Sequence, residues 1–383
     1  MIRRKIEPRH DWQAKVEADG LIWHTAEGKP YWNEASYYAF TPGQIEEIHG
    51  ATEELYRLFV GAGDAIVHDP RLMERFRIPD AFHDAVRAAW HAEPAALNYG
   101  RFDLGYDGTG SAKLFEFNCD TPTSLLEAAV IQWSWKQERF PQADQFNSLH
   151  DKLVAKWRDL APHLSSVVYF AHVADDAGED TVTVSYLRDT AQAAGLTTVP
   201  ILMSDIGWDS EHGCFADLDG NPMWSTFKLY PWEWMVHEEF GAQLLKTLER
   251  GDTQWLEPIW KMIWSNKAIL PILWDLHPDH PNLLPATFDI PAGDAVAKPL
   301  LSREGANVSI RRGGQVIAQA EGEYGEEGYV YQGLYPLPES APGCFPVIGS
   351  WVVDGEPAGM GIREDGLITG NTARFVPHII IEA

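Results

Sequence analysis

The sequence predicts an α+β fold in which a small α/β unit stands before an antiparallel sheet. Three observations support this. A β-α-β rhythm runs through residues 166–240. Short strand-like segments follow one another closely after residue 246, as antiparallel sheets require. A β-hairpin is predicted upstream of both regions. The chain is therefore expected to divide into segments 1–165, 166–245 and 246–383.

The composition indicates a large, well-packed globular protein. The chain has 383 residues, 45% of them hydrophobic and 16 of them Trp, which is too long for one simple core. It contains no apolar run of the roughly 18 residues that a membrane helix needs. The basic start, Met1–Lys5, precedes no apolar segment, so no signal peptide is expected. With three widely spaced cysteines, a reducing cytoplasm is the expected location.

The net charge of −26 argues against nonspecific binding to nucleic acid. It suits a cationic or amine partner, although an acidic surface also serves solubility alone. Neither a nucleic acid nor a membrane is therefore expected as a partner. A homodimer is expected only because symmetric dimers are common.

The first 90 residues are predicted to be mainly helical. Thr41 and Pro42 form an N-cap and first-turn pair, and Ile48 and Leu55 lie on one apolar stripe of the helix that follows. A second, polar helix is expected around Arg71–Trp90.

The predicted hairpin joins segments Asn98–Leu104 and Ala112–Asn118 through the turn Asp107–Gly110. Glycine and aspartate at these turn positions tolerate the backbone angles of a tight reversal.

Four polar residues occupy alternate positions on this hairpin. Arg101 shares one strand face with Asp103, and Glu116 shares one with Asn118. If the two faces coincide, they combine carboxylate and amide oxygens suited to Mg²⁺ with a guanidinium suited to a phosphate or carboxylate. The alternative is a solvated face with cross-strand ion pairs.

The loop after the hairpin has the pattern of an anion-binding helix start. Ser124 and Glu127 match a capping box, which places a helix N-terminus just beyond Asn118. Thr121 and Thr123 add hydroxyl donors. The simpler alternative is that Ser124 only caps a core helix.

The α/β unit is predicted from a buried strand at Val167–His172, a helix at 182–194 and a strand at Leu196–Leu202. Residues 209–222 are expected to form an exposed turn region. Later strands are expected at Ala295–Pro299, Val308–Arg312, Tyr329–Leu334, Val347–Val353 and Ala358–Arg363.

Several features of the last segment suggest nucleotide binding only weakly. Lys298 ends one strand, and a loop with Gly305 follows that can fold over phosphates. The backbone from Gln332 to Tyr335 can offer hydrogen bonds to an adenine edge. Lys267 precedes an apolar run, and a lysine in that position usually extends to solvent. Arg363 can equally form a surface ion pair.

Together these stretches resemble the synthetase domain of the glutathionylspermidine synthase family. The matching stretches are Gly100–Asp103, Phe115–Ser124, Asn266–Trp274, Val296–Pro299 and Tyr331–Leu334. The resemblance spans nearly the whole chain. It implies a permuted ATP-grasp-type fold, in which the metal ligands precede the phosphate-covering lysines, with a preceding α/β (pre-ATP-grasp) unit at 166–245 and a nucleotide-binding lobe at 246–383.

The resemblance also implies roles for individual residues. Arg101 and Lys298 would be catalytic, with Arg101 binding the transferring phosphoryl group. The Mg²⁺ ligands would be Asp103, Glu116 and Asn118. The nucleotide would contact Arg101, Phe102, Asp103, Lys267, Lys298, Glu304, Gly305, Gln332, Gly333, Leu334, Tyr335 and Leu367. The substrates would contact Thr121, Thr123, Ser124, Glu179, Asp180 and Arg363.

Three features depart from the family pattern. No amidase region is expected before the synthetase region. Leu229 stands where the family has a hydroxyl residue that contacts the peptide substrate. Near the C-terminus Arg374 would repel a polyamine, where the family has an acidic residue.

The predicted function is an ATP-dependent acid–amine ligase that uses Mg²⁺ and forms an amide through an acyl phosphate. Its partners would be a small acid and a small amine, both left open. Two alternatives remain: a nucleotide-binding protein without ligase activity, and a Mg²⁺-dependent phosphohydrolase.

Overall fold

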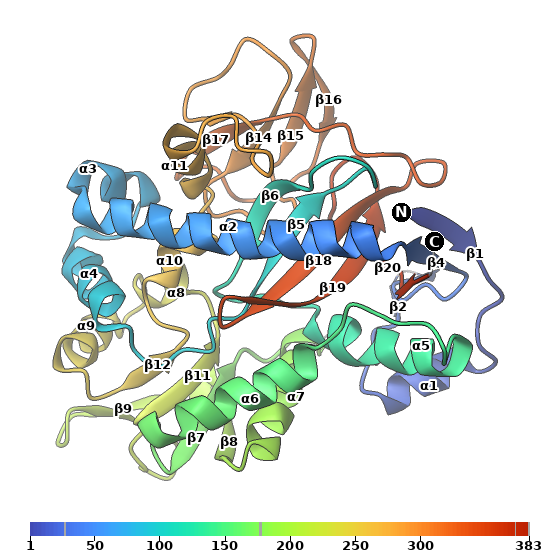
Figure 1. Ribbon diagram of the computed structural model, residues 1–383. Coiled ribbons are helices and arrows are strands. Elements are labelled where there is room, and N and C mark those ends of the chain that lie inside the picture. Colours follow the sequence, from blue (N-terminus) through green and yellow to red (C-terminus); the bar gives the residue numbers. More distant parts are fainter. Residues whose placement is uncertain (27, 176–177, 372, 382–383) are drawn as a thin grey trace.

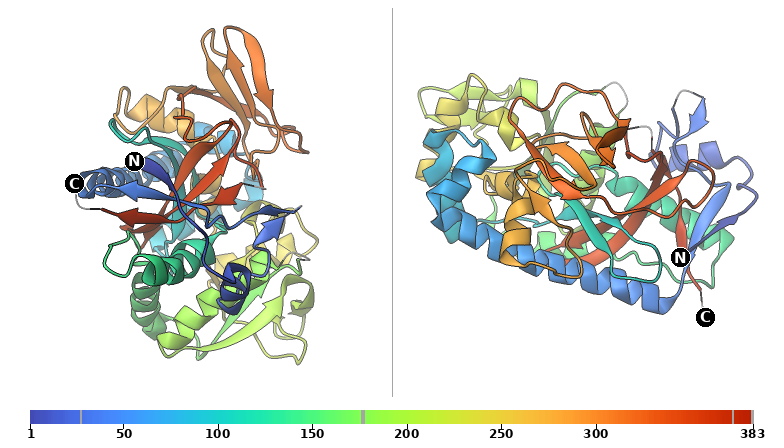
Figure 2. Two further views of the ribbon diagram at one scale, coloured as in Figure 1. Left: turned by 90° about the vertical axis from the view of Figure 1, so that its right-hand side faces the viewer. Right: turned by 90° about the horizontal axis from the view of Figure 1, so that it is seen from above.

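The computed structural model describes residues 1–26, 28–175, 178–371 and 373–381. Its fold is α+β, as predicted, and its three main sheets lie one after another in space (Figure 1). Figure 2 shows the hairpin sheet between an antiparallel sheet at one end and the α/β unit at the other.

The central sheet contains the predicted hairpin, and all of its pairings are antiparallel. Its order is β20-β19-β18-β5-β6. The strands are β5 (Gly100–Gly105), β6 (Lys113–Asn118), β18 (Phe345–Val353), β19 (Glu356–Asp365) and β20 (Arg374–Phe375). Strands expected in one C-terminal sheet are thus divided, because β18 and β19 join the hairpin. The division at 165 and 245 stays a prediction, and this sheet combines strands from its first and third segments.

The long helix α2 (Pro42–His68) covers one face of the central sheet (Figure 1). Thr41 and Gln44 form a capping box at its start, which confirms the predicted N-terminus. Phe59 packs against Phe102 and Phe117 with ring centroids 5.4 and 5.1 Å apart. Since side chains alternate along a strand, the opposite face is left to the polar residues.

The predicted helix at 71–90 is broken. It consists of α3 (Pro70–Met73), two 3₁₀ turns (Glu74–Phe76 and Asp80–Phe82) and α4 (His83–Ala92). Arg77 adopts a positive φ of 58° between them, which no continuous helix allows.

The second antiparallel sheet has the order β13-β17-β14-β15-β16. Its strands are β13 (Ala286–Thr287), β14 (Ala295–Pro299), β15 (Ser309–Arg312), β16 (Gln315–Gln319) and β17 (Tyr329–Gly333). Helices α10 (Lys261–Ser265) and α11 (Ile269–Leu276) precede it.

The α/β unit is a four-stranded parallel sheet of order β12-β11-β7-β8. Its strands are β7 (Val167–His172), β8 (Thr197–Leu202), β11 (Ser225–Leu229) and β12 (Gln254–Leu256). Its helices are α6 (Leu149–Leu160), α7 (Glu179–Ala193), α8 (Trp232–Met235) and α9 (Gly241–Arg250). The predicted β-α-β rhythm is confirmed, and the expected turn region contains the ribbon β9 (Gly207–Asp209) and β10 (Cys214–Ala216).

A small sheet brings the two ends of the described chain together. Strands β1 (Ile2–Lys5) and β21 (His378–Ile380) both pair with β4 (Ser36–Phe40). Other elements are α1 (Trp12–Ala18), α5 (Gln132–Arg139) and the short pair β2 (Thr25–Ala26) and β3 (Lys29–Pro30). Within the described ranges, no helix is both long and apolar enough to cross a membrane.

Candidate active site

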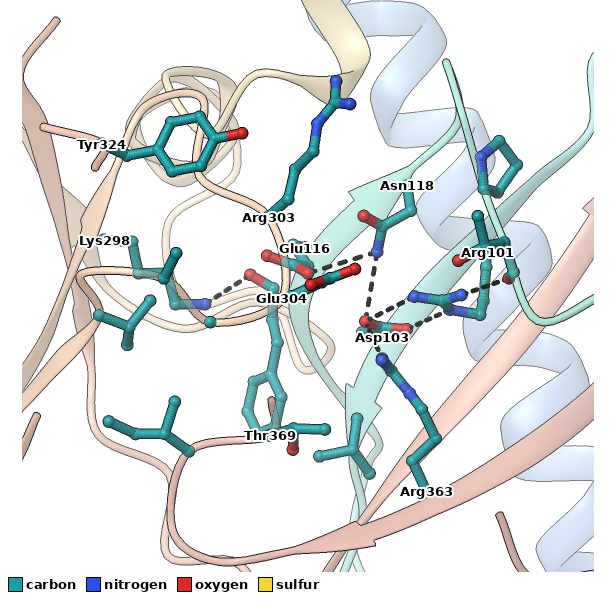
Figure 3. A pocket seen from close by; sticks show the side chains of 18 of the residues that line it. Arg101, Asp103, Glu116, Asn118, Lys298, Arg303, Glu304, Tyr324, Arg363 and Thr369 are labelled. Atoms are coloured by element: carbon teal, nitrogen blue, oxygen red, sulfur yellow. Dashed lines mark hydrogen bonds and ion pairs between the residues drawn. The ribbon is translucent and has the colours of Figure 1, made fainter. Parts of the chain in front are cut away.

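A cavity of about 640 Å³ lies where the three main sheets meet (Figure 3). The hairpin, strands β14 and β17, and the ends of β7 and β11 all contribute to its wall. Of the predicted site residues, those that line it are Arg101, Asp103, Glu116, Asn118, Thr121, Thr123, Asp180, Lys298, Glu304, Gly305, Gln332, Gly333, Leu334, Tyr335, Arg363 and Leu367.

The strand register places the four hairpin residues on one face. Arg101 stands opposite Asn118, and Asp103 stands opposite Glu116. The register shifts just after Asp103, so Phe115 is the extra residue of a bulge. Bulges locally re-aim side chains and are frequent beside active sites. The expected coincidence of the two faces is thus observed.

Asp103 lies between two arginines. Its Oδ1 accepts a hydrogen bond from Nε of Arg101 at 2.7 Å, and its Oδ2 is 2.6 Å from a guanidinium nitrogen of Arg363. Arg101 also donates to the carbonyl of Thr123 at 2.7 Å. The hairpin, β19 and the loop after β6 are therefore joined through one carboxylate.

Glu116 lies on the same face and is surrounded by cations. Its Oε2 is 3.2 Å from Nζ of Lys267. Burial favours a higher pKa for Glu116, but the charges of Lys267 and Lys298 outweigh burial and lower the pKa to about 2. Glu116 is therefore an anion at neutral pH and can bind a cation.

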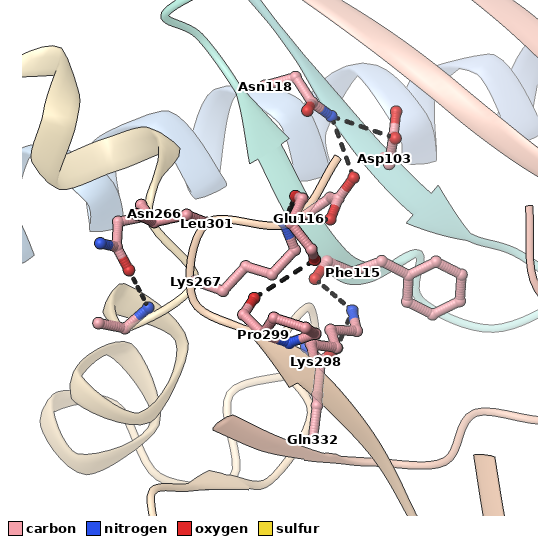
Figure 4. Close-up of polar contacts among 12 residues, drawn as sticks. Asp103, Phe115, Glu116, Asn118, Asn266, Lys267, Lys298, Pro299, Leu301 and Gln332 are labelled. Atoms are coloured by element: carbon pink, nitrogen blue, oxygen red, sulfur yellow. Dashed lines mark hydrogen bonds and ion pairs between the residues drawn. The ribbon is translucent and has the colours of Figure 1, made fainter. Parts of the chain in front are cut away.

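Lys298 connects the two antiparallel sheets (Figure 4). Its Nζ donates to the carbonyl of Phe115 and to Oε1 of Gln332, both at 2.8 Å. Gln332 in turn donates to the carbonyl of Leu114 at 2.9 Å. Burial lowers the pKa of Lys298 to about 8, against the opposing effect of Glu116. A cation that is mostly charged near neutral pH is thus held at the cavity wall.

The donor set on the hairpin fits Mg²⁺. The amide nitrogen of Asn118 donates to Oδ2 of Asp103 at 3.2 Å and to Oε1 of Glu116 at 3.3 Å, so both carboxylates lie beside this amide, whose oxygen would be the group that binds a metal. Hard oxygen ligands in that arrangement suit Mg²⁺, which usually takes only one or two protein carboxylates. Across the described residues, no group of three or more His, Cys, Asp or Glu side chains suited to a metal is present. The fit therefore depends on two carboxylates and one amide.

The loop between β14 and β15 covers part of the cavity. Gly305 has a φ of 70°, and a Cβ there would lie only 2.7 Å from the carbonyl oxygen of Thr369. Glycine is therefore required for this close approach. Arg303, in the same loop, forms an ion pair with Glu233 of α8.

The substrate side of the cavity includes Thr121, Thr123 and Asp180. Burial, followed by the charges of Asp175 and Glu179, raises the pKa of Asp180 to about 7. A carboxyl group with that pKa can exchange a proton with an amine near neutral pH. Glu179 is absent from the described lining, and burial also raises its pKa.

The expected capping box after the hairpin is not formed. Ser124 has a φ of 70°, whereas an N-cap residue needs an extended backbone. Glu127 is buried and accepts a hydrogen bond from the hydroxyl of Tyr31 at 2.8 Å instead. The helix still begins directly after Ser124, with a π-helical turn at Glu127–Ile131. Ser124 is buried outside the cavity lining.

Two further predicted residues lie away from the cavity. Phe102 is fully buried and stacks on Phe117 at 3.8 Å, on the face turned to α2, so its side chain does not reach a nucleotide there. Lys267 lines a small neighbouring pocket of about 50 Å³ and reaches the site only through Glu116.

The sequence interpretation missed several lining residues and one supporting glycine. Arg303, Trp234 and Tyr324 line the cavity from three different segments. Arg303 was recognisable as a cation beside Gly305. Gly349 on β18 makes room for Arg101, because a Cβ there would lie 2.6 Å from Cδ of Arg101.

Comparison with known proteins identifies relatives across the full length. A family model described as "Glutathionylspermidine synthase preATP-grasp" matches residues 3–381. A Haemophilus influenzae protein, named provisionally as an acid–amine ligase, is 40% identical over 93% of each chain. Trypanothione synthetase of Crithidia fasciculata is 31% identical over 84% of this chain but only 53% of its own length.

More distant similarities agree. The bifunctional glutathionylspermidine synthetase/amidase of Escherichia coli is 27% identical over 96% of this chain and 62% of its own. The solved structure of a glutathione synthetase-like effector from Globodera pallida matches with a TM-score of 0.57 at 9% identity, covering 97% of this chain and 96% of that one, and shows a shared fold. The chain therefore belongs to the glutathionylspermidine synthase family, a family of ATP-dependent ligases.

Proposed function

We propose that this protein joins a carboxylic acid to an amine at the expense of ATP. A carboxylate oxygen attacks the γ-phosphorus of ATP, the bond to the β–γ bridging oxygen breaks, and ADP leaves. The amine nitrogen then attacks the acyl carbon, phosphate leaves, and the nitrogen loses a proton. The product is an amide.

One observation carries this proposal. One cavity is lined by the oxygen-rich face of the hairpin, by Lys298 with the backbone segment Gln332–Tyr335, and by residues of the α/β unit. These three parts match the needs of metal-bound phosphates, a nucleotide and an organic substrate. The order along the chain, with Asp103 and Glu116 before Lys267 and Lys298, supports a permuted ATP-grasp arrangement with the α/β unit as its pre-ATP-grasp part.

Phosphoryl transfer asks the protein mainly for alignment and for compensation of negative charge. Arg101 and Lys298 supply fixed positive charge for the transferring phosphoryl group and the acyl phosphate. Asp103, Glu116 and Asn118 would hold Mg²⁺, which neutralises phosphate charge when bound. Glu304, Gly305, Leu367 and the Gln332–Tyr335 backbone surround the nucleotide in this proposal.

We place the two substrates in the part of the cavity lined by Arg363, the loop after β6 and Asp180. Arg363 and the loop with Thr121 and Thr123 would receive the acid. Asp180 would accept a proton from the amine, because its pKa of about 7 lies near neutral pH.

A screen of phosphate release with paired acids and amines tests this function. Product masses must show condensation with loss of water, and omission of either partner must abolish product. Phosphate released equally in buffer alone would identify a phosphohydrolase instead. ATP binding by calorimetry, with no phosphate release from any pair, would identify a binding protein.

A further inference from the structure

Apart from Asp180 of α7, the wall that the α/β unit gives to the cavity is apolar. Its residues are Val173, Leu229, Tyr230, Pro231 and Trp234. They follow or end the parallel strands β7 and β11, or lie in α8. Ligands of open α/β sheets bind beyond the carboxyl ends of such strands.

Trp234 is the most informative residue of this wall. It is 43% exposed, whereas Trp232 in the same short helix is fully buried. Its ring lies 5.4 Å from that of Tyr230, edge to face. Two neighbouring aromatic rings at the rim of a cavity form an apolar surface that a ligand can cover.

Around Tyr230 and Trp234, the neighbouring polar side chains are already paired. Glu233 forms its ion pair with Arg303, whose guanidinium carbon lies 5.2 Å from the centre of the Trp234 ring. The hydroxyl of Tyr230 donates to Glu238. Lys228, on the strand that carries Leu229, is fully buried and paired with Asp120.

Away from Asp180, a polar substrate group against this wall would therefore lose water without gaining a partner, which is costly. An apolar group would gain the free energy of its own burial and that of the wall. Leu229 contributes an aliphatic side chain to this wall.

We propose that this wall is a specificity subsite for an acid substrate whose side chain or distal end is apolar or aromatic. The proposal rests on the proposed function for its assignment to the acid. Thr121 and Thr123 line the same cavity, and the carbonyl of Thr123 accepts a hydrogen bond from Arg101. The carboxylate of a substrate lying along the wall would then face Arg101 and Arg363.

Calorimetric binding of straight-chain carboxylates without ATP tests the subsite independently of catalysis. From butanoate to octanoate, the affinity should rise about fourfold for each methylene that contacts the wall. The heat-capacity change should become more negative along the series. Matched ω-hydroxy acids should bind more weakly than the alkanoates.

Two variants locate the effect, and a third controls for the loss of a tryptophan. Trp234→Ala and Leu229→Ser should each weaken octanoate binding about tenfold and flatten the dependence on chain length. Trp224→Ala should change nothing, because Trp224 is 41% exposed on the α/β unit but does not line the cavity. Trp234 is 43% exposed, so Trp234→Ala is expected to fold, and a thermal melt of the variant checks this.

The proposal is overturned if no acid binds in the millimolar range, if affinity is independent of chain length, or if Trp234→Ala binds octanoate as well as Trp224→Ala. Binding that follows the expected pattern without any phosphate release would support the subsite while contradicting the ligase function.

Discussion

Carboxylates are paired with basic side chains both in the buried scaffold and at the wall of the cavity, but the two sets of ion pairs serve different roles. In the scaffold, Lys228 lies 2.6 Å from Asp120, and Lys261 lies 2.9 Å from Glu257, with side chains at most 1% exposed. In the cavity, Asp103 is paired with two arginines but borders open volume (Figure 3).

The difference lies in what can replace each partner. Both oxygens of each aspartate have protein partners, and Asp120 accepts the backbone amide of Trp232 at 2.8 Å, but Asp103 borders a cavity of about 640 Å³ and Asp120 only a small pocket. The pocket that Asp120 borders has a volume of only about 50 Å³, too small for a nucleotide. The oxygens of Asp103 and Glu116 face a space where a cation can substitute for the basic side chains. A buried ion pair can thus take part in ligand binding when it borders a cavity large enough for the ligand.

The largest expected effect is on the scaffold. Lys228→Met leaves Asp120 buried without its cation and should lower the free energy of unfolding by about 3–5 kcal/mol. Denaturant melts measure this. The double variant with Asp120→Leu should recover much of the loss, because no charge remains buried. Equal stability of the single and double variants would contradict this view of the pair.

Arg101→Ala should act on turnover instead. Loss of an electrostatic contact to the transition state costs about 3–4 kcal/mol, or roughly 10²–10³ in kcat. Stability should change little, since Arg363 still neutralises Asp103. Steady-state assays and thermal melts together check both parts. Near-normal turnover would exclude Arg101 from the chemistry, and a collapse of the melting temperature would assign it to the scaffold.

Mg²⁺-ATP should stabilise the protein through the cavity pairs. At a ligand concentration of 100 times Kd, the expected gain is about 2.7 kcal/mol. Glu116→Gln should reduce this gain, whereas Lys152→Ala should keep it, because Lys152 pairs with Glu356 on the surface. Differential scanning with and without EDTA provides the measurement. A gain that EDTA leaves intact would remove Mg²⁺ from the site.

A buried, uncharged histidine, His378, predicts that the stability of the protein depends on pH. Nε2 of His378 accepts the amide of Phe146 at 3.2 Å, and its Nδ1 donates to Gln132 at 2.9 Å. Burial lowers the pKa of His378 to about 3, from 6.5. The folded state therefore binds fewer protons than the unfolded state between these values.

Stability should accordingly be full above pH 6.5 and fall as the pH drops toward 3, by about 2 kcal/mol between pH 7 and pH 5. His378→Gln should flatten that slope, and His10→Gln, at an exposed position, should not. An unchanged slope in the His378 variant would show that other groups carry the pH dependence.

Local patterns predicted much of what builds the site. The alternation along the hairpin placed Arg101 and Asp103 on one face, and the register confirms it. The turn residue Asp107 accepts the amides of Thr109 and Gly110, as turn chemistry requires. The same alternation would have excluded the side chain of Phe102, a residue suggested only by resemblance.

The failures lie where distant segments meet. The capping box predicted at Ser124 is wrong, because Ser124 has a positive φ and Glu127 instead accepts a hydrogen bond from Tyr31, 96 residues away in sequence. Lys267 lines a neighbouring pocket, where it contacts Glu116 and the carbonyl of Ser302, and its contact with a nucleotide stays a prediction.

By itself, the sequence determined the strands, their polar faces and the turn that joins the hairpin, because these depend on periodicity and on residues a few positions apart. Only the tertiary structure decided that β18 pairs with β5, that α2 covers the apolar face, and that Trp234 meets the same cavity as Asp103. Such contacts depend on which surfaces bury each other most completely. That competition involves the whole chain at once, so no local pattern encodes its outcome.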